Sequence, residues 1–359
     1  MSTLKITTQF ILIINLVFGC TTPEKKDSQI SFAPTLKTEF ARKFQYTSDG
    51  VRVTEPWPGA KKPINYKIPE APKRVIVTST THLPYLELLG VENTLVGFPN
   101  TQYVSSHKIR KLIDQGKVND LGPDGNMNLE LLIALDPDLV FAFDMGKEST
   151  TLDKIQEAGI PVIYNSDYLE SSALGRAEWI KFFGTFFHRE DLADSIFNAI
   201  NLRYDSLKHL ANQADKKPTI FSGVMYGDVW YLPGGQNWAA EFYNDAGGDY
   251  LWKEDSTGGW LEISFESVFD KAHAADYWIG TSTFNSLNEL ANQDKRYMEF
   301  AAFKNQKIYS YNKRISPSGG YDFFESGYAR PDIVLADFIK ILHPELLPDY
   351  ETYYFQKLK

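Results

Sequence analysis

The sequence predicts an α/β fold: two similar lobes, each built on a parallel sheet, bridged by one long helix with a cleft between them. Three observations support this prediction. Short apolar strands alternate with helical segments from residue 74 onward, as expected for βαβ units. An Asn-Leu-Glu block at residues 128–130 is echoed by Ser-Phe-Glu at residues 264–266. Between the two halves, residues 171–213 place apolar side chains at helical spacing.

Length and charge narrow the classes of protein that fit. The 359 residues suffice for about two domains, and a hydrophobic content of 43% allows each to bury a core. The formal net charge of −9 argues against a nucleic-acid surface, which needs a basic face. Cys20 is the only cysteine in the sequence, so we expect neither a disulfide nor a thiolate zinc site in the body of the chain.

The first 20 residues are typical of a bacterial lipoprotein signal peptide. Residues 10–18 form an apolar run that is too short to span a bilayer as a helix. Gly19 and Cys20 follow directly, with Val17 three positions before the cysteine, and this arrangement resembles a lipobox. We expect Cys20 to carry the lipid. An ordinary signal peptide with a chance cysteine is the alternative.

Residues 21–72 are predicted to form an extension ahead of the first lobe. The stretch up to about Phe32 is polar and is expected to act as a tether. Residues 44–53 alternate around Ser-Asp-Gly, which predicts a hairpin. A Pro-Trp-Pro-Gly segment at residues 56–59 ends it, and a short linker leads to the first lobe.

The first lobe is expected over residues 73–170. Residues 74–78 are predicted to be a buried strand, and the next helix stops at Gly90, a residue type that commonly follows a helix end. A helix over 129–135 ends before Asp-Pro, because proline disfavours helical geometry in the residue before it. Further strands are predicted at 94–98, 139–143 and 162–164, and a further helix at 152–158.

The second lobe, residues 214–359, repeats this plan after the bridging stretch. A helix over residues 238–245 is expected to stop at a Gly-Gly pair, and Pro331 opens the last helix at a position where proline is favourable. Strands are predicted at 219–225, 275–279 and 307–311. In the bridge only Gly175 and Gly184 could interrupt a helix, so one stiff connection between the lobes is expected.

No motif for catalysis, metal binding or cofactor binding stands in the sequence. The six histidines form no HxH, HxxxH or HExxH pattern, so a zinc site would need distant ligands. No GxSxG, P-loop or GxGxxG follows a predicted strand. We therefore expect no catalytic residue, no metal site, no cofactor and no enzyme activity, although a pair of carboxylates could still build a hydrolase.

A parallel-sheet protein nevertheless has a predictable binding site, because ligands bind beyond the carboxyl ends of the strands. Residues just after predicted strands, or in the loops and helices beside them, are therefore the candidates. Tryptophans in loops are harder to explain as core residues than tryptophans in helices, although loop packing remains the alternative for each. The candidates are His82, Tyr85, Tyr103, Trp230, Tyr231, Trp238, Trp260 and Arg314, the last being the best-placed cation.

These stretches resemble the class III periplasmic binding proteins, which are the iron–siderophore, haem and cobalamin receptors of ABC importers. The resemblance covers about residues 70–345. The N-terminal hairpin and its Pro-Trp-Pro-Gly segment look like the version found in Bacteroidetes-type lipoproteins. The matching stretches are residues 74–77, 127–140, 245–248, 264–266 with 275–276, and 330–332.

The resemblance implies a ligand cleft between the lobes that closes only modestly. It also implies how the protein docks onto its permease. In the family one glutamate on each lobe meets an arginine pocket on the permease dimer, and Glu130 and Glu266 stand at those positions. The alternative is purely local. Each acid follows an Asn or Ser N-cap at the second residue of a predicted helix, where the helix dipole stabilises a carboxylate without any partner.

The resemblance also narrows the ligand. Trp260 matches an aromatic residue that lines the cobalamin site in the cobalamin-binding member. The aromatic residue that this member carries in its first lobe is missing here, because residues 120–125 read Asp-Leu-Gly-Pro-Asp-Gly. This weakens cobalamin itself and leaves an iron chelate, haem or another corrinoid open.

The sequence therefore predicts a monomeric substrate-binding lipoprotein that delivers a metal chelate to an ABC permease. We expect it in the periplasm, attached to the cell membrane by the lipid on Cys20, with outer-membrane or surface placement also open. Nucleic acid is not expected as a partner. A scavenging surface lipoprotein without an ABC partner is the alternative, and an enzyme that uses the cleft is the third hypothesis.

Overall fold

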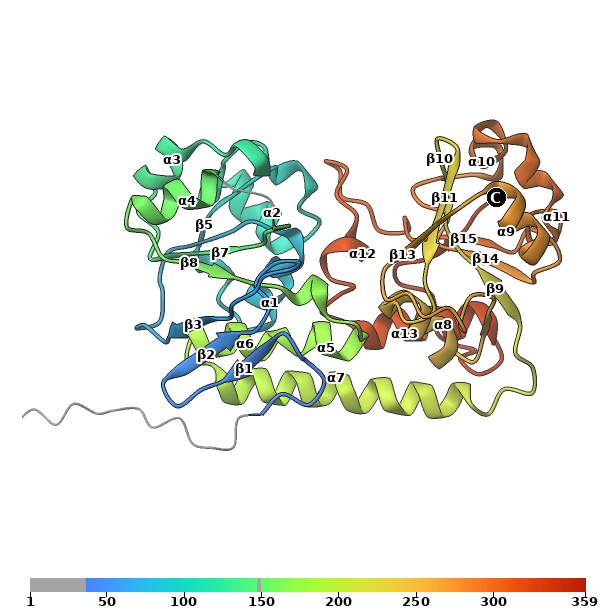
Figure 1. Ribbon diagram of the computed structural model, residues 1–359, viewed down its shortest axis with the longest axis horizontal. Coiled ribbons are helices and arrows are strands. Elements are labelled where there is room, and N and C mark those ends of the chain that lie inside the picture. The colour runs from blue at the N-terminus through green and yellow to red at the C-terminus, as the bar shows by residue number, and fades with distance from the viewer. Residues whose placement is uncertain (1–36, 147–149) are drawn as a thin grey trace, which may run out of the picture. The chain divides into compact units, whose positions relative to one another are not determined.

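The computed structural model describes residues 37–146 and 150–359 (Figure 1). The predicted signal peptide and Cys20, the proposed lipid site, lie outside the described residues. All described residues belong to one compact unit. This unit contains four sheets. A three-stranded antiparallel sheet lies near the N-terminus, each lobe has one five-stranded sheet, and the second lobe has a further three-stranded antiparallel sheet.

The N-terminal extension contains the predicted hairpin. Strands β1 (Phe44–Tyr46) and β2 (Gly50–Val53) pair in antiparallel fashion, with Tyr46 opposite Val51. A third strand, β3 (Ile64–Lys67), pairs with β2. The sequence analysis placed a linker there, because its alternating pattern is only four residues long.

Two buried carboxylates attach this extension to the first lobe. Glu178 accepts hydrogen bonds from the backbone N–H groups of Phe40 and Ala41, both at 2.8 Å, and also forms an ion pair with Lys181 at 3.2 Å. Glu170 accepts from the N–H of Lys43 at 2.8 Å. The chain just before β1 is therefore held by charge-assisted hydrogen bonds, which are stronger than neutral ones.

The first lobe is a five-stranded parallel sheet with helices on both faces. Val75 and Val77 pack into one core and Ile76 into another, so the alternating side chains of one strand reach both layers. The strand order is β6-β5-β4-β7-β8. The strands are β4 (Val75–Val77), β5 (Leu95–Phe98), β6 (Asn119–Asp120), β7 (Leu139–Ala142) and β8 (Val162–Tyr164), and the helices are α1 (Leu83–Leu88), α2 (His107–Asp114), α3 (Leu129–Ala134) and α4 (Thr150–Glu157).

The bridge differs from the expected single helix over residues 171–213. It consists of α5 (Ala173–Ala177), α6 (Trp179–Phe186) and the long α7 (Glu190–Ala211). His188 has a φ of 52° and lies in the turn before α7, so the chain changes direction without a glycine or proline. Helix α7 runs beneath both lobes (Figure 1) and packs against α6 and against α13 (Pro331–Leu342). The lobes are thus bridged by one long helix.

The second lobe repeats the parallel plan and adds an antiparallel sheet. Its main sheet has the order β12-β9-β14-β15-β16, in which only β16 is antiparallel to its neighbour. The predicted strand 219–225 is broken at Gly223, which has a φ of +82° and whose Cβ would lie 1.8 Å from the Tyr231 carbonyl oxygen. The main-sheet strands are β9 (Thr219–Phe221), β12 (Asp249–Tyr250), β14 (Tyr277–Ile279), β15 (Ile308–Ser310) and β16 (Gln356–Lys357), and the antiparallel sheet is β10 (Val224–Tyr226), β11 (Val229–Pro233) and β13 (Trp260–Ile263).

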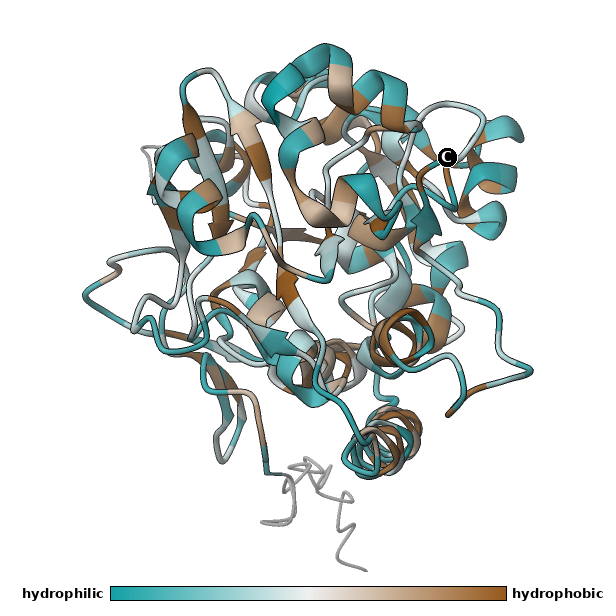
Figure 2. Cartoon of the chain, turned by 90° about the vertical axis from the view of Figure 1, so that its right-hand side faces the viewer, coloured by the Kyte–Doolittle hydropathy of each residue, from teal (hydrophilic) through white to brown (hydrophobic). Residues whose placement is uncertain are grey.

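Helices complete the second lobe, and its core is rich in aromatic rings. Phe221 stacks on Trp278 with ring centroids 4.9 Å apart, and Trp230 lies 5.5 Å from Trp278. Figure 2 shows hydrophobic strands at the centre and hydrophilic residues on the outer sides of the helices. Besides α13, the helices are α8 (Trp238–Asp245), α9 (Phe265–Ala272), α10 (Leu287–Gln293), α11 (Ala301–Lys304) and α12 (Asp322–Glu325).

Candidate functional site

A cavity of about 580 Å³ opens at the carboxyl end of the second parallel sheet. Ser222 follows β9, Gly280 follows β14 and Tyr311 follows β15, and all three line it. This is the edge at which a parallel sheet places its ligand. The volume lies in the range typical of small-molecule sites, about 300–1,000 Å³.

The walls of this cavity, called the aromatic cavity below, come from both sheets and from the helices beside them. Tyr231 projects from β11, Trp238 from α8 and Trp260 from β13. Trp260 is 56% exposed and lies at the rim. The structure thus gathers three of the residues selected from the sequence around one cavity, and their contact with a ligand stays a prediction.

None of the described residues that line the aromatic cavity is an Asp, Glu, Lys, Arg or His. Its buried polar groups partly satisfy one another, because the Tyr243 hydroxyl donates to Ser222 Oγ at 3.0 Å. Burial raises the pKa of Tyr243 to about 12, and burial also raises the pKa of Tyr311 and Tyr328. These phenols therefore stay protonated, and the wall carries no charge at neutral pH.

Arg176 lies behind this wall and was missed by the sequence analysis. Its guanidinium carbon is 4.5 Å from the ring centre of Trp238 and 5.0 Å from that of Tyr328. It donates to the backbone carbonyls of Tyr168 at 2.7 Å and Glu170 at 3.3 Å. No local pattern marks Arg176, because its role comes from α5 of the bridge packing against α8.

Three predicted ligand contacts are corrected by the structure, which places them in the cores. His82, Tyr85 and Trp230 are each 0% exposed. The His82 ring lies 5.7 Å from that of Phe183, and burial lowers the pKa of His82 to about 3. Trp230 donates its indole N–H to the Ser222 carbonyl at 2.9 Å. His82 and Tyr85 lie in the helices that follow β4, and Trp230 lies within β11, but all three side chains turn inward, which sequence position alone does not reveal.

In the first lobe, the Tyr85 hydroxyl is also held by contacts inside the protein. It donates to the Arg176 carbonyl at 2.8 Å and lies 3.4 Å from Asp167. Burial raises the pKa of Asp167 to about 6, although the nearby Arg176 opposes this shift. Tyr85 therefore supports the bridge instead of lining the aromatic cavity.

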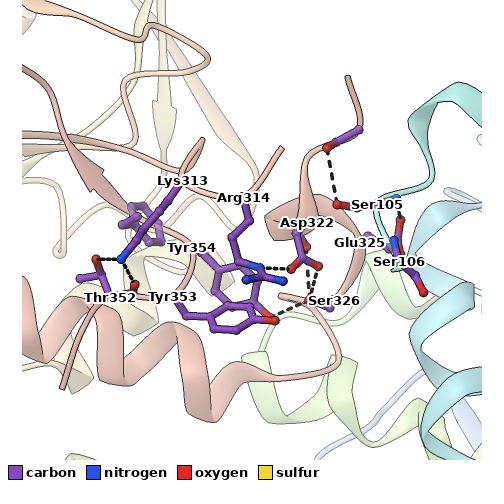
Figure 3. A network of polar contacts seen from close by, with 12 residues as sticks. Ser105, Ser106, Lys313, Arg314, Asp322, Glu325, Ser326, Thr352, Tyr353 and Tyr354 are labelled. Carbon is purple, nitrogen blue, oxygen red and sulfur yellow. Dashed lines mark hydrogen bonds and ion pairs between the residues drawn. The ribbon is translucent and has the colours of Figure 1, made fainter. Parts of the chain in front are cut away.

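Arg314 lines a second, smaller cavity of about 290 Å³ that has residues of both lobes in its walls. Its Nε donates to Asp322 at 2.8 Å, and its guanidinium carbon lies 4.2 Å from the ring centre of Tyr353. Figure 3 shows this pair beside Glu325. Arg314 is thus paired within the second lobe and does not line the aromatic cavity. Tyr103 is 53% exposed and lies outside the aromatic cavity as well.

Glu325 joins the two lobes at this smaller cavity. Its carboxylate accepts from the backbone N–H groups of Ser105 at 2.5 Å and Ser106 at 2.8 Å (Figure 3). Burial, together with the charges of Asp322 and Glu87, raises the pKa of Glu325 to about 8. We call this set of contacts the inter-lobe latch. The sequence analysis missed Glu325, because an acid on a four-residue helix carries no pattern.

Glu130 and Glu266 occupy matching positions in the two lobes. Each is the second residue of its helix, and the Asn128 and Ser264 caps accept from backbone N–H groups at 3.0 Å and 3.2 Å. Both are exposed. Glu266 also forms an ion pair with Arg296 at 3.4 Å. Helices α3 and α9 both lie on the side away from α7 in Figure 1.

Among the described residues, no group of three or more His, Cys, Asp or Glu side chains could hold a metal ion. None of the helices in the described ranges is long and apolar enough to cross a membrane.

Comparison with known proteins relates the chain to one family. The model of a family described as periplasmic binding protein matches residues 75–315. An uncharacterized lipoprotein of Methanocaldococcus jannaschii is 27% identical over 313 residues, covering 84% of this chain and 72% of its own. A vitamin B12-binding protein of Vibrio campbellii is 24% identical over 145 residues, covering 40% of this chain and 50% of its own.

A solved structure supports the same fold. The periplasmic heme binding protein of Pseudomonas aeruginosa aligns with a TM-score of 0.59 at 17% identity. The alignment covers 80% of this chain and 98% of that protein. At this level of identity the likeness extends to the fold alone.

Proposed function

Because this chain belongs to the periplasmic binding protein family, we propose that it is the solute receptor of an ABC importer. It binds a metal chelate in the aromatic cavity and passes it on chemically unchanged. The observation that carries this proposal is the position of that cavity, which lies at the carboxyl ends of β9, β14 and β15 and is lined by aromatic rings. Relatives named for heme and vitamin B12 support a large, flat metal complex as the ligand class.

Delivery to a permease requires a docking surface, and Glu130 and Glu266 supply its charges. Both carboxylates are exposed at helix starts on the side away from α7. An arginine of the permease that pairs with either carboxylate would form a charge-assisted contact, worth about 1.5–3 kcal/mol. Even without a permease, the helix dipole stabilises each carboxylate at this position by about 0.3–1 kcal/mol.

A lipid on Cys20 would keep the receptor at the membrane where the permease works. The apolar run that ends in Gly19-Cys20 supports this anchor, as does a relative that is named a lipoprotein. Changing Cys20→Ala should release the protein into the soluble fraction. A mutant that stays in the membrane and keeps a palmitate label would contradict the anchor.

The test of the receptor function compares ligand uptake with ligand affinity in the same variant. We expect Glu130→Ala/Glu266→Ala to abolish uptake by cells while the purified protein binds its ligand as before. Glu157→Ala/Glu262→Ala is the matched control, because both acids are exposed and neither caps a helix start. The control should transport normally.

Each other result has a distinct meaning. Normal uptake by the Glu130/Glu266 variant would show that the two acids only stabilise their helices, and it would favour a scavenging lipoprotein without an ABC partner. A loss of affinity would place them in the binding site and contradict the docking role. A chemically altered ligand after incubation would indicate an enzyme.

A further inference from the structure

We infer that the part of the ligand that enters the aromatic cavity carries no net charge. This inference rests on the proposed function and deepens it, because iron chelates range from neutral complexes to trianions. From its position in the sequence, Arg314 is expected to be the best-placed cation for ligand contact. The structure removes that cation from the cavity and leaves the described lining without a charged side chain.

Three arginines on elements around the aromatic cavity already have partners within the chain. Arg314 is bound to Asp322 at 2.8 Å. Arg330, which precedes α13, is bound to Asp332 at 2.8 Å. Arg176 donates to backbone carbonyls and lies against the rings of Trp238 and Tyr328, which stand between it and the cavity. Each cation therefore has partners elsewhere in the chain.

An anion in this cavity would lose its water without gaining a counter-charge. An unpaired buried charge is among the costliest groups in a protein interior. Within the wall, the protonated phenols of Tyr243, Tyr311 and Tyr328 offer only neutral hydroxyl groups. A neutral complex avoids this cost, and its apolar faces match the aromatic rings, which bury large areas and stack in offset or edge-on geometry.

The chemistry of the site therefore selects a neutral metal complex with broad apolar faces and hydroxyl or amide groups at its edge. A neutral ferric tris-hydroxamate and cyanocobalamin meet this description. A ferric tris-catecholate, with three negative charges, and haem, with two carboxylates, do not unless their charged groups stay in water.

Calorimetric titration of the full mature chain with these four complexes tests the inference. We expect a neutral complex to bind at least about 100-fold more tightly than the ferric tris-catecholate. The Kd of the neutral complex should hardly change between low and high salt, because salt screens only interactions between charges. The variant Gln293→Lys adds a cation at an exposed position of the lining. It should improve tris-catecholate binding several-fold and leave the neutral complex unaffected.

Equal or tighter binding of the tris-catecholate by the unmodified protein would overturn the inference while leaving the receptor function intact. A strong loss of affinity of the preferred complex in high salt would overturn it as well. If none of the four complexes binds, the proposed chelate-binding function fails, and the inference fails with it.

Discussion

The carboxylate of Glu325 in the second lobe accepts a hydrogen bond from the backbone N–H of Ser106 in the first lobe at 2.8 Å. Ser106 is also the N-cap of α2, where its hydroxyl accepts from the Ile109 N–H at 3.2 Å. One buried acid is therefore tied both to the start of a first-lobe helix and to the second lobe. This contact links the lobes at a place remote in sequence from the bridging helix.

The latch should make stability depend on pH. The pKa of Glu325 is raised from 4.5 to about 8, so the folded chain holds a proton that the unfolded chain releases above pH 4.5. The contribution of Glu325 to the free energy of unfolding is therefore greatest at low pH and declines as pH rises toward 8. Glu325→Gln cannot titrate, and its free energy of unfolding should fall less between pH 5 and pH 8.

Urea unfolding at both pH values measures this difference. Glu87, Asp322, His107, Lys108 and Arg314, which line the same cavity, are present in both proteins. Equal pH dependence of the two proteins would show that Glu325 does not hold a raised pKa.

The substitution Gly320→Ala should loosen the inter-lobe latch by pushing the backbones of the two lobes apart. A Cβ at Gly320 would lie 2.1 Å from the carbonyl oxygen of Tyr103, so Gly320→Ala must push the two segments apart. The amides of Ser105 and Ser106 should then exchange hydrogen faster. Gly125→Ala is the control, because a Cβ there meets nothing within 4 Å. Unchanged protection at both serines would argue against a close contact.

Glu178, which lies in the bridge and binds the N-terminal extension, should matter far more to stability than Glu55, a surface acid of that extension. Removing it leaves the N–H groups of Phe40 and Ala41 without their acceptor, while the buried Lys181 keeps its second ion pair, with Asp194 at 3.0 Å. Each buried donor that is left unsatisfied costs about 1–3 kcal/mol. Glu55→Ala, which breaks a half-exposed pair with Lys43, should cost at most about 1 kcal/mol. Chemical denaturation measures both, and similar losses would contradict the role of Glu178 in holding the chain before β1.

His82→Phe should improve stability in acid. The pKa of His82 is lowered from 6.5 to about 3, so below pH 6.5 the unfolded chain binds a proton that the folded chain excludes. This difference destabilises the fold by up to about 2 kcal/mol between pH 7 and pH 5. Phenylalanine keeps an aromatic ring beside Phe183 and cannot titrate. Melting temperatures at pH 7 and pH 5 give the comparison, and an equal drop in both proteins would refute the assignment.

Much of the fold could be predicted because strands and helices carry their own patterns. The strands around Val75, Val140 and Ile163 are apolar on both faces, and Asn128 and Ser264 announce helix starts. The break in the bridge could not be predicted, because no glycine or proline marks the turn at His188, where the backbone adopts a positive φ that is uncommon outside glycine. Strand β3 was missed because four residues give too short a pattern.

The site could be predicted only in part. Tyr231, Trp238 and Trp260, which were selected as candidates from the sequence, line the cavity, although they lie on β11, α8 and β13 and not at the ends of the parallel strands. The inward rotation of His82 and Trp230 depends on what packs against them, and the pairing of Arg314 depends on Asp322 on a separate helix. Such tertiary contacts leave no trace in helical or strand periodicity.

The central claim is that the aromatic cavity of the second lobe is the ligand site, and filling it tests this claim most directly. Ala239 lines the cavity from α8, while Ala274 is exposed and lies outside it. We would measure the Kd of the complex that binds the unmodified protein by calorimetry, in Ala239→Trp and in Ala274→Trp. The account predicts at least a 100-fold loss of affinity in Ala239→Trp with unchanged circular dichroism, and normal affinity in Ala274→Trp. Unchanged affinity in folded Ala239→Trp would contradict it.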